Sequence, residues 1–258
     1  LKDSKRVFAV ICKYEIDLIF HLGAQPIVTV AVNNPLETYE TNIMGTANVL
    51  EGSRLYGNVN GILVTSSDKA YGKIPRASEK DPIGGDHPYE TSKAAADLIA
   101  QNYYKTYKMP VVITRFGNVY GEGDLNFNRI IPGIMKSIAK KEIFDIRSNG
   151  KFIRDYIYVG DVVEAMIKLM TNINKVKGEA FNVSSLENMS VIDAVKKVEK
   201  ILKTKIDYKI LSTAVNEIPV QSVNYAKFKK AFDWKPSVSF NTTIQNIYNW
   251  YKKHFELL

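Results

Sequence analysis

Five residues within a short span of the sequence could carry acid–base chemistry. Ser67, Asp68 and Lys69 are consecutive in the stretch SSDKAYG, and Tyr89 and Lys93 follow in HPYETSK. If the second stretch is helical, Tyr89 and Lys93 lie one turn apart on the same face. A nearby ammonium stabilises a phenolate and lowers the tyrosine pKa, so such a pair can exchange protons near neutral pH. The spacing alone is also typical of a chance pair on a solvated face, because the chain contains 15 tyrosines.

The composition is that of an ordinary globular chain. Its 258 residues are 45% apolar and 24% charged, which predicts one large domain or two small ones. No apolar run approaches the ~20 residues of a membrane span, and no signal peptide is visible, so we expect no membrane association. The single cysteine, Cys12, excludes an internal disulfide framework and favours a cytoplasmic location.

The net charge of +8 predicts an anionic partner, either nucleic acid or a phosphorylated small molecule. The lysines are scattered, and the stretch KKVEKILKTK (196–205) alternates them with apolar residues as a solvated helix face does. No helix-turn-helix, zinc-knuckle or RNA-platform signature accompanies the charge, so we expect no nucleic acid. His21, His87 and His254 lack metal-ligand spacing, so we expect no metal site.

The first half of the chain alternates strands and helices. We expect buried strands at 16–23, 61–68 and 111–121, separated by helices at 35–56 and 88–108. This order predicts an α/β fold with a Rossmann-like, doubly wound parallel sheet. Ligands of such sheets bind beyond the carboxyl ends of the strands, which here read GAQ, TSSDK and RFGN.

The second half is less regular and predicts a smaller, mainly helical part. Helices are expected at 128–141, 161–172, 189–204 and 240–255, with a short strand at 179–185. Asp161 and Ser190 are the candidate N-caps of two of these helices. We therefore predict a domain over 1–120 and a second part over 121–258, with 151–185 woven back into the first sheet.

Several motifs then occur in the order of a known family. They are FHLGAQ, NIMGTANVLE, TSSDKAYG, PYETSK, RFGNVYG, RDYIYVGDVVEA and FNVSS. With them the chain resembles, over essentially its whole length, the extended short-chain dehydrogenase/reductase superfamily in its nucleotide-sugar epimerase and dehydratase branch. The resemblance implies NAD as cofactor, a nucleotide sugar as substrate, and a homodimer formed through helices 37–56 and 88–108.

The resemblance also implies a role for each matching residue. Tyr89 would remove the proton of the sugar 4-hydroxyl while hydride leaves C4 for NAD. Lys93 would bind the nicotinamide ribose and lower the tyrosine pKa, and Ser67 would hydrogen-bond the 4-oxygen. The implied cofactor-binding residues are Ala24, Gln25, Asn42, Tyr89, Lys93 and Phe116, and the implied substrate-binding residues are Asn118, Arg129 and Arg154. Alternatively, Asn118 is a turn residue, and Arg154 forms a surface ion pair with Asp155.

The residues Asp68 and Lys69 distinguish a 4,6-dehydratase from a 4-epimerase. The 4-epimerases of this branch usually carry small or apolar residues here, whereas a 4,6-dehydratase needs an acid for the departing 6-hydroxyl and a base for the C5 proton. Asp-Lys resembles the enzymes acting on CDP-glucose, with Asp68 as the acid and Lys69 acting at or near C5. The stretch KFIRDYIYVGDV (151–162) departs from that pattern, so UDP-, dTDP- and GDP-sugars stay open. The alternative is that Asp68 caps a turn and Lys69 is solvated.

The glycine-rich cofactor loop of this superfamily has no counterpart in the sequence. No G-x-G-x-x-G follows an early strand, and GEGDLNF (121–127) lacks the third glycine. By the resemblance, about 60 residues carrying two βα units would precede Leu1 and supply the pyrophosphate-binding turn. We therefore expect that the chain is a fragment of a longer protein, is completed by a partner, or is a non-catalytic remnant that binds nucleotide sugars. For the reaction itself, the alternative to a 4,6-dehydratase is a 4-epimerase.

Overall fold

The structure is a computed structural model that describes residues 1–213 and 218–256. It contains two compact units. The first unit comprises residues 1–116, 164–183 and 223–233, and the second comprises 117–163, 184–222 and 234–258. No helix among the described residues is long and apolar enough to cross a membrane.

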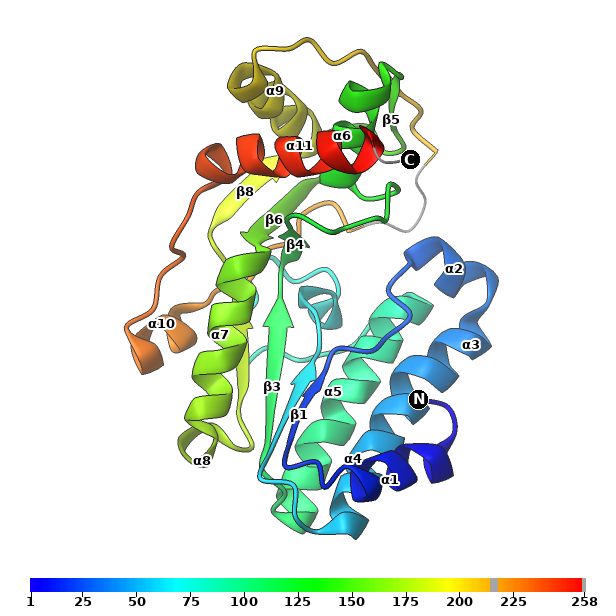
Figure 1. Cartoon of the computed structure of the whole chain (residues 1–258), viewed down its shortest axis with the longest axis vertical. Helices are drawn as coiled ribbons and strands as arrows, with labels where there is room; N and C mark the ends of the chain where they lie inside the picture. The colour runs from blue at the N-terminus through cyan, green and yellow to red at the C-terminus, as the bar shows by residue number, and fades with distance from the viewer. Residues whose placement is uncertain (214–217, 257–258) are drawn as a thin grey trace. The chain divides into compact units, whose positions relative to one another are not determined.

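The first unit contains a four-stranded, entirely parallel sheet (Figure 1). Its strands, in the order β1-β2-β3-β7, are Leu18–His21, Gly61–Thr65, Val111–Phe116 and Ala180–Val183. The central strands β2 and β3 are rich in Val and Ile and are buried along nearly their whole length, as strands covered on both faces must be. The predicted parallel α/β sheet is thus confirmed.

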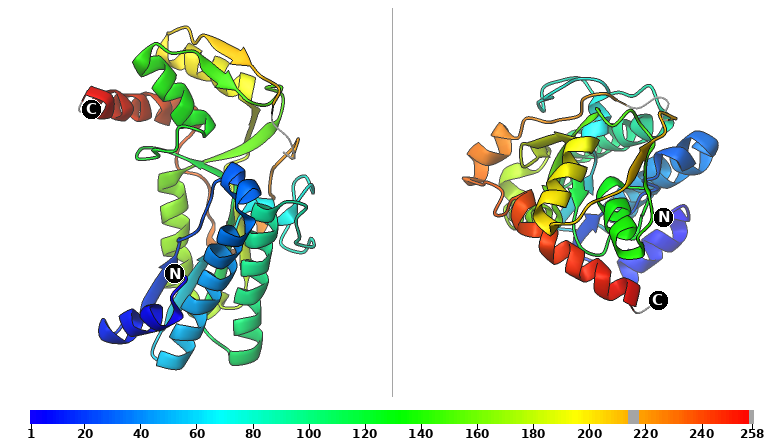
Figure 2. Two further views of the ribbon diagram at one scale, coloured as in Figure 1. Left: turned by 90° about the vertical axis from the view of Figure 1, so that its right-hand side faces the viewer. Right: turned by 90° about the horizontal axis from the view of Figure 1, so that it is seen from above.

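Helices cover both faces of this sheet. On one face, α1, α4 and α5 pack their apolar residues against the strands, and α4 and α5 lie side by side in both views (Figures 1 and 2). The helices of this unit are α1 Ser4–Lys13, α2 Val28–Asn33, α3 Pro35–Tyr39, α4 Gly45–Tyr56, α5 Pro88–Tyr107, α8 Ile173–Val176 and α10 Ala226–Phe232. The helix α7, Val159–Thr171, begins in the second unit and ends in the first.

The helix predicted at 35–56 is confirmed, but it is not regular. Between α3 and α4 the backbone forms one π-helical turn, η1, at Glu40–Met44. Gly57 ends the helix in the left-handed conformation with φ +82°, which a residue without a Cβ adopts without strain. The π turn was not expected, and such turns are frequent at functional sites.

Two predicted strands differ from the observed ones. The strand β1 was expected to be buried, but it is the edge of the sheet, so Leu18 and Phe20 remain 46% and 42% exposed. The strand expected over 111–121 is two strands, β3 in the first unit and β4, Asn118–Tyr120, in the second. Gly117 separates them, and a Cβ at this position would lie 2.8 Å from the carbonyl oxygen of Asp155.

The second unit, which was predicted to be mainly helical, also contains two small sheets that were not predicted. In one, β4 pairs in parallel with β6, Ile153–Tyr158, and β6 pairs antiparallel with β8, Glu187–Ser190. In the other, β5, Phe144–Ile146, pairs with β9, Tyr208–Ile210. These strands are short, and polar residues such as those of IRDYIY interrupt the apolar pattern that reveals a strand.

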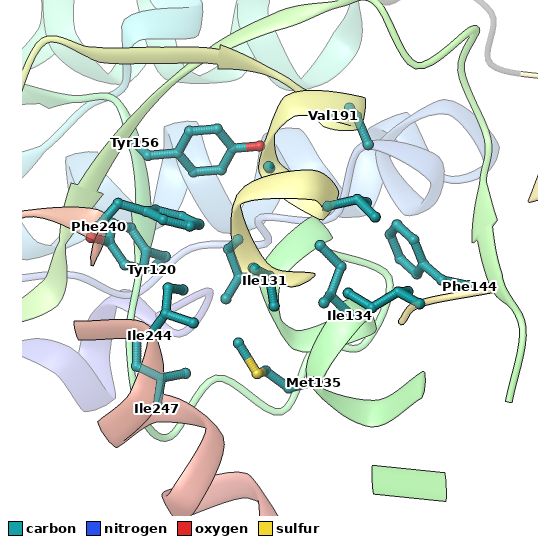
Figure 3. Packing of buried hydrophobic residues seen from close by; sticks show 14 of the residues in the cluster. Tyr120, Ile131, Ile134, Met135, Phe144, Tyr156, Val191, Phe240, Ile244 and Ile247 are labelled. Carbon is teal, nitrogen blue, oxygen red and sulfur yellow. The ribbon is translucent and has the colours of Figure 1, made fainter. Parts of the chain in front are cut away.

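The helices of the second unit are α6 Ile130–Lys140, α9 Val191–Leu202 and α11 Phe240–Glu256. Their apolar faces surround one hydrophobic core with Tyr120 and Tyr156 from the strands (Figure 3). Ser190 caps α9 as predicted, in a capping box with Asp193. Asp161 is not an N-cap, because it lies inside the first turn of α7 and accepts hydrogen bonds from the backbone and hydroxyl of Ser237.

Candidate active site

The carboxyl end of β2 leads into a short 3-10 helix, η2, Asp68–Tyr71. Ser67 caps this helix: its hydroxyl accepts a hydrogen bond from the backbone N–H of Lys69 (3.2 Å) and donates one to Oδ1 of Asp68 (3.0 Å). The ammonium of Lys69 lies 3.4 Å from the same carboxylate oxygen, and its side chain is only 21% exposed. The alternative that Asp68 caps the turn and Lys69 is solvated is therefore wrong.

The second carboxylate oxygen of Asp68, Oδ2, is buried without a hydrogen-bond partner among the described residues. A buried carboxylate oxygen that receives no hydrogen bond is costly, so such an atom marks a place that suits a donor from outside the protein. A substrate hydroxyl is a donor of that kind. The carboxylate therefore combines a fixed oxygen, held by Ser67 and Lys69, with one that is available for chemistry.

The first turn of α5 presents Tyr89 and Lys93 to the interior. Pro88 occupies the first helical position, and Nδ1 of His87 caps the helix by accepting from the N–H of Tyr89 (3.2 Å). Tyr89 and Lys93 are both buried, which excludes the alternative of a chance pair on a solvated face. The ammonium of Lys93 donates to the carbonyl oxygen of Thr65 (2.6 Å), so it lies at the carboxyl end of β2.

Burial lowers the pKa of Lys93 to about 8, and the carboxylate of Asp97 on the next turn of α5 opposes that shift. An ammonium has three protons, and the carbonyl of Thr65 takes one of them. The others can serve a phenolate and a ribose hydroxyl. A lysine with this pKa stays mostly protonated at neutral pH, yet it can release a proton more easily than a solvated lysine.

Asn42, on the π turn, links three segments around these residues. Its Oδ1 accepts from the backbone N–H of Gln25 (2.7 Å), and its Nδ2 donates to the carbonyl of Gln25 (3.1 Å) and to the hydroxyl of Ser92 (2.9 Å). The side chain of Gln25 bonds in turn to Thr38 and to the N–H of Ile27. The loop after β1 is thereby joined to α5, and the sequence alone did not identify Ser92 as part of this arrangement.

The other predicted cofactor residues of the first unit follow strand ends. Ala24 is half-buried in the loop after β1, and Phe116 is the buried last residue of β3. His21, at the end of β1, is buried, and its Nε2 lies 2.9 Å from the hydroxyl of Thr46. Burial is the main cause that lowers the pKa of His21 to about 4, with the charge of Lys93 adding to it, so the imidazole is neutral.

The three predicted substrate-binding residues lie in the second unit. Asn118 is the first residue of β4 and pairs with Tyr156, so the alternative that it is a turn residue is wrong. Arg129 donates to Asp124 (2.7 Å) and to the carbonyl of Val119 (2.6 Å), which fixes its guanidinium beside β4.

Arg154 belongs to β6 and is buried. It donates to the carbonyl oxygens of Ile153 (2.9 Å) and Ile218 (2.7 Å). Asp155 is buried as well and accepts from the hydroxyl of Ser184 (2.6 Å). The alternative of a surface ion pair between Arg154 and Asp155 is therefore wrong, since neither side chain lies on the surface.

Tyr156 is a further candidate that the sequence analysis missed. Burial raises the pKa of its phenol, and the charges of Arg154 and Arg129 oppose this rise, so both guanidiniums act on the same hydroxyl. That hydroxyl is buried without a hydrogen-bond partner among the described residues. Arg154 and Tyr156 are two residues apart on a strand and hence share a face, a signal that became readable only once β6 was known.

All predicted catalytic and cofactor-binding residues thus lie in the first unit, and the predicted substrate-binding residues lie in the second. In the first unit, Asp68, Lys69 and Lys93 lie at the carboxyl end of β2, and Tyr89 lies one helical turn before Lys93 on α5. In the second, two arginines and a phenol offer donors suited to an anion such as a diphosphate. Within the described ranges, no group of three or more His, Cys, Asp or Glu side chains could hold a metal ion.

Comparison with known proteins places the chain among enzymes of sugar nucleotides. The family model described as GDP-mannose 4,6 dehydratase matches residues 1–247. CDP-paratose 2-epimerase from Salmonella typhi is 26% identical over 97% of this chain and 82% of its own length. For dTDP-D-glucose 4,6-dehydratase from Mus musculus the identity is 30%, over 93% of this chain and 69% of that protein. CDP-glucose 4,6-dehydratase from Salmonella typhimurium is 32% identical over 57% of this chain and 45% of its own length.

Solved structures agree on the fold. The chain superimposes with a TM-score of 0.85 and 26% identity on dTDP-glucose 4,6-dehydratase from Bacillus anthracis in complex with NAD, covering 99% of this chain and 78% of the other. UDP-glucuronic acid 4-epimerase from Bacillus cereus, in complex with UDP-glucuronic acid and NAD, gives a TM-score of 0.90 at 22% identity, covering 98% and 80%. Together with the observed sheet, these similarities confirm the Rossmann-like α/β fold.

Proposed function

We propose that this chain, which belongs to the GDP-mannose 4,6 dehydratase family of extended short-chain dehydrogenases/reductases, carries the site of an NAD-dependent nucleotide-sugar 4,6-dehydratase. The observation that supports dehydration most directly is the Asp68 carboxylate, which Ser67 and Lys69 hold on one oxygen and whose other oxygen has no hydrogen-bond partner among the described residues. A 4-epimerase has no step that needs such an acid. The proposed substrate is CDP-glucose, and the proposed product is CDP-4-keto-6-deoxyglucose.

The residues around β2 suit NAD as the cofactor. The protons of Lys93 that Thr65 does not take fit a ribose hydroxyl, and the loop that Asn42 and Gln25 hold together lies beside α5. Solved relatives that share this fold were crystallised with NAD. When bound, NAD would supply a hydride acceptor for C4 of the sugar and later a hydride donor for C6.

Tyr89, Lys93 and Ser67 would handle the proton at the 4-oxygen. The phenolate of Tyr89 removes the hydroxyl proton as C4 becomes a ketone, and the ammonium of Lys93, one turn away, stabilises that phenolate. The hydroxyl of Ser67 donates to the 4-oxygen instead of to Asp68, with which it bonds in this structure. The exchange frees Asp68 for the second step.

Asp68 and Lys69 would then eliminate water across C5 and C6. Transfer of one proton within their ion pair, whose atoms lie 3.4 Å apart, yields a carboxylic acid and a neutral amine. The amine takes the C5 proton, the C6–O bond breaks, and the acid protonates the departing hydroxyl, which leaves as water. Both side chains return to the charged pair observed here, and the ammonium can give its proton back to C5 when C6 is reduced.

Two observations support CDP-glucose as the substrate. The Asp-Lys sequence at 68–69 resembles the enzymes acting on CDP-glucose, and a CDP-glucose 4,6-dehydratase is among the relatives. Arg129, Arg154 and Tyr156 are suited to the diphosphate, which every nucleotide sugar shares.

Proton NMR of the intact protein with NAD and CDP-glucose in deuterated water tests the proposal. We expect a new C6 methyl signal with deuterium at C5. A product that keeps its 6-hydroxyl and has the galactose configuration would instead establish a 4-epimerase. Parallel incubations with UDP-glucose, dTDP-glucose and GDP-mannose identify the base. Binding of a sugar nucleotide with no turnover of any of the four would support the non-catalytic alternative.

Two matched variants sharpen this experiment. Asp68→Asn keeps the shape of the side chain but cannot act as an acid, so we expect C4 oxidation without the methyl product. Asp124→Asn alters a carboxylate of the second unit that pairs with Arg129, and it should leave the elimination step intact while weakening substrate binding.

We also infer a cytoplasmic homodimer formed through α4 and α5. These helices pack side by side and carry the exposed apolar residues Leu55 and Leu98, with Met44 just before α4. Light scattering after gel filtration should give twice the chain mass for the native protein. Leu98→Glu should give the monomer mass, whereas Leu125→Glu, at an exposed position of the second unit, should not change the mass.

A further inference from the structure

A buried ion pair lies one helical turn beyond Lys93. Arg115, on β3, and Asp97, on α5, are 2% and 0% exposed. The guanidinium binds the carboxylate through two of its three nitrogen arms: Nε donates to Oδ2 (2.8 Å) and Nη2 donates to Oδ1 (3.0 Å). Such a bidentate pair is geometrically specific, and its cost of burial makes it a poor choice for stability alone.

The third arm of Arg115 reaches the segment that carries Asp68 and Lys69. Its Nη1 donates to the hydroxyl of Tyr71 (2.6 Å), the last residue of η2, and the guanidinium also lies 4.8 Å from the centre of that ring. The hydroxyl of Tyr71 in turn donates to Oδ1 of Asn182 on β7 (2.8 Å). One guanidinium therefore connects α5 to η2 through the sheet.

Both ends of this connection adjoin proposed catalytic groups. Asp97 is four residues after Lys93 on α5, so the two side chains share a face, and the carboxylate acts on the ammonium directly. Tyr71 is two residues after Lys69, within the same 3-10 helix. A substitution at Arg115 would therefore change the electrostatic surroundings of Lys93 and would also release the contact that holds η2 in place.

We propose that Arg115 is a positioning residue that balances the charge of Asp97 beside Lys93 and holds η2, with Asp68 and Lys69, at a fixed place relative to α5. The catalytic meaning of this proposal rests on the proposed function. The charge balance does not, because it can be measured at Lys93 without turnover.

The charge balance has two opposing parts. The carboxylate of Asp97 favours the protonated lysine, and the guanidinium of Arg115 cancels part of that influence. Titratable groups on the elements around Lys93 include Tyr89, Glu90 and Asp97 on α5, His21 on β1, Asp68, Lys69 and Tyr71 on η2, and Arg115 on β3. His21 is neutral, so it adds no charge of its own at neutral pH.

Titration of Lys93 by the carbon chemical shift of its Cε tests the charge balance. The signal is assigned by its loss in Lys93→Met, and we expect a midpoint of about 8 for the native protein. Arg115→Gln leaves the carboxylate unopposed and should raise the midpoint, whereas Asp97→Asn leaves the guanidinium unopposed and should lower it. Gln101→Met is the matched control, since Gln101 donates to Asp97 without charge (2.8 Å) and should leave the midpoint in place.

The opposite signs distinguish a charge balance from simple loosening. If the pair only packs the interior, both variants would admit water and move the midpoint upward, toward the ordinary lysine value. That result, or two unchanged midpoints, would overturn the first half of the proposal. Circular dichroism of each variant identifies any that does not fold.

Tyr71→Phe tests the second half with a milder change, because only a hydroxyl is removed. We expect formation of the methyl product to fall at least tenfold while hydride transfer from C4, followed as NADH absorbance in a single turnover, changes less than twofold. Equal loss of both steps, or no loss of either, would overturn the positioning of η2. If no nucleotide sugar reacts at all, the proposed function fails, and the titrations of Lys93 still decide the first half.

Discussion

Lys93 and Arg115 are two buried cations of the first unit with opposite surroundings. Lys93 faces the carbonyl oxygen of Thr65, and burial lowers its pKa to about 8. Arg115 faces the carboxylate of Asp97 through two hydrogen bonds, and those bonds and the opposite charge raise its pKa despite burial. The difference indicates that a buried cation is easier to deprotonate where it hydrogen-bonds to a carbonyl dipole, and is held as a structural charge where it hydrogen-bonds to a carboxylate.

The largest effect on the reaction rate is expected when Lys93 loses its charge. Lys93→Met should lower the rate of product formation by about two to four orders of magnitude, because the phenolate loses the ammonium that stabilises it. The fold should survive, since the methionine replaces a buried charge with an apolar side chain of similar length. Initial rates from NMR together with a thermal melt check this. A less than tenfold loss would contradict the role of Lys93.

Removing the structural cation should act on folding instead. Arg115→Met leaves the carboxylate of Asp97 buried without its partner, so we expect the free energy of unfolding to fall by about 3–5 kcal/mol. Urea unfolding followed by circular dichroism measures it. The double variant Asp97→Leu/Arg115→Met should recover much of the loss, because no buried charge remains. Equal stability of the single and double variants would show that the pair is not coupled.

The lowered pKa of Lys93 makes stability depend on pH. Between about 8 and the ordinary lysine value of about 10.5, the unfolded chain binds more protons than the folded one at this position, so stability rises with pH. Below pH 8 both states are protonated and the folded state carries the full penalty. We expect the free energy of unfolding of the native protein to gain about 3 kcal/mol over this window relative to Lys93→Met, as paired urea titrations would show. Parallel curves for the two proteins would contradict the shift.

The smallest change in stability is expected for Gln101, the uncharged residue that hydrogen-bonds to Asp97. Gln101→Met removes one hydrogen bond to Asp97, whose carboxylate keeps both bonds from Arg115. We expect a loss of about 1 kcal/mol or less in the free energy of unfolding and an unchanged reaction rate. A loss as large as that of Arg115→Met would mean that hydrogen bonding, and not charge, holds Asp97.

The placing of Tyr89 and Lys93 on one helix face was predictable from sequence because its geometry is local. Tyr89 and Lys93 need only a helix to share a face, and Pro88 followed by a run of good helix formers indicates where that helix begins. The parallel sheet was predictable for the same reason, since each strand is a continuous apolar run between turn residues. The resemblance to a family added roles to these positions but not the contacts between them.

The contacts that hold the site were not predictable, because they join residues far apart in the chain. Asn42 hydrogen-bonds to Ser92, which is 50 residues away in the sequence, and Arg115 hydrogen-bonds to Tyr71, which is 44 residues away. No spacing rule connects such residues. The exposure of β1 was missed on similar grounds, because an apolar run does not indicate how many neighbours its strand will have.

By itself, the sequence determined which side chains could react and on which elements they lie, since helical and strand periodicities act over a few residues. Only the tertiary structure decided their state. It buried Lys93 against a carbonyl and lowered its pKa, and it paired the charge of Asp97 with Arg115. It also paired Asp68 with Lys69 and left one carboxylate oxygen of Asp68 without a hydrogen bond from any residue that the structure describes. Protonation and hydrogen bonding depend on the distances between side chains that folding brings together. Those distances do not follow from the spacing of the residues in the sequence.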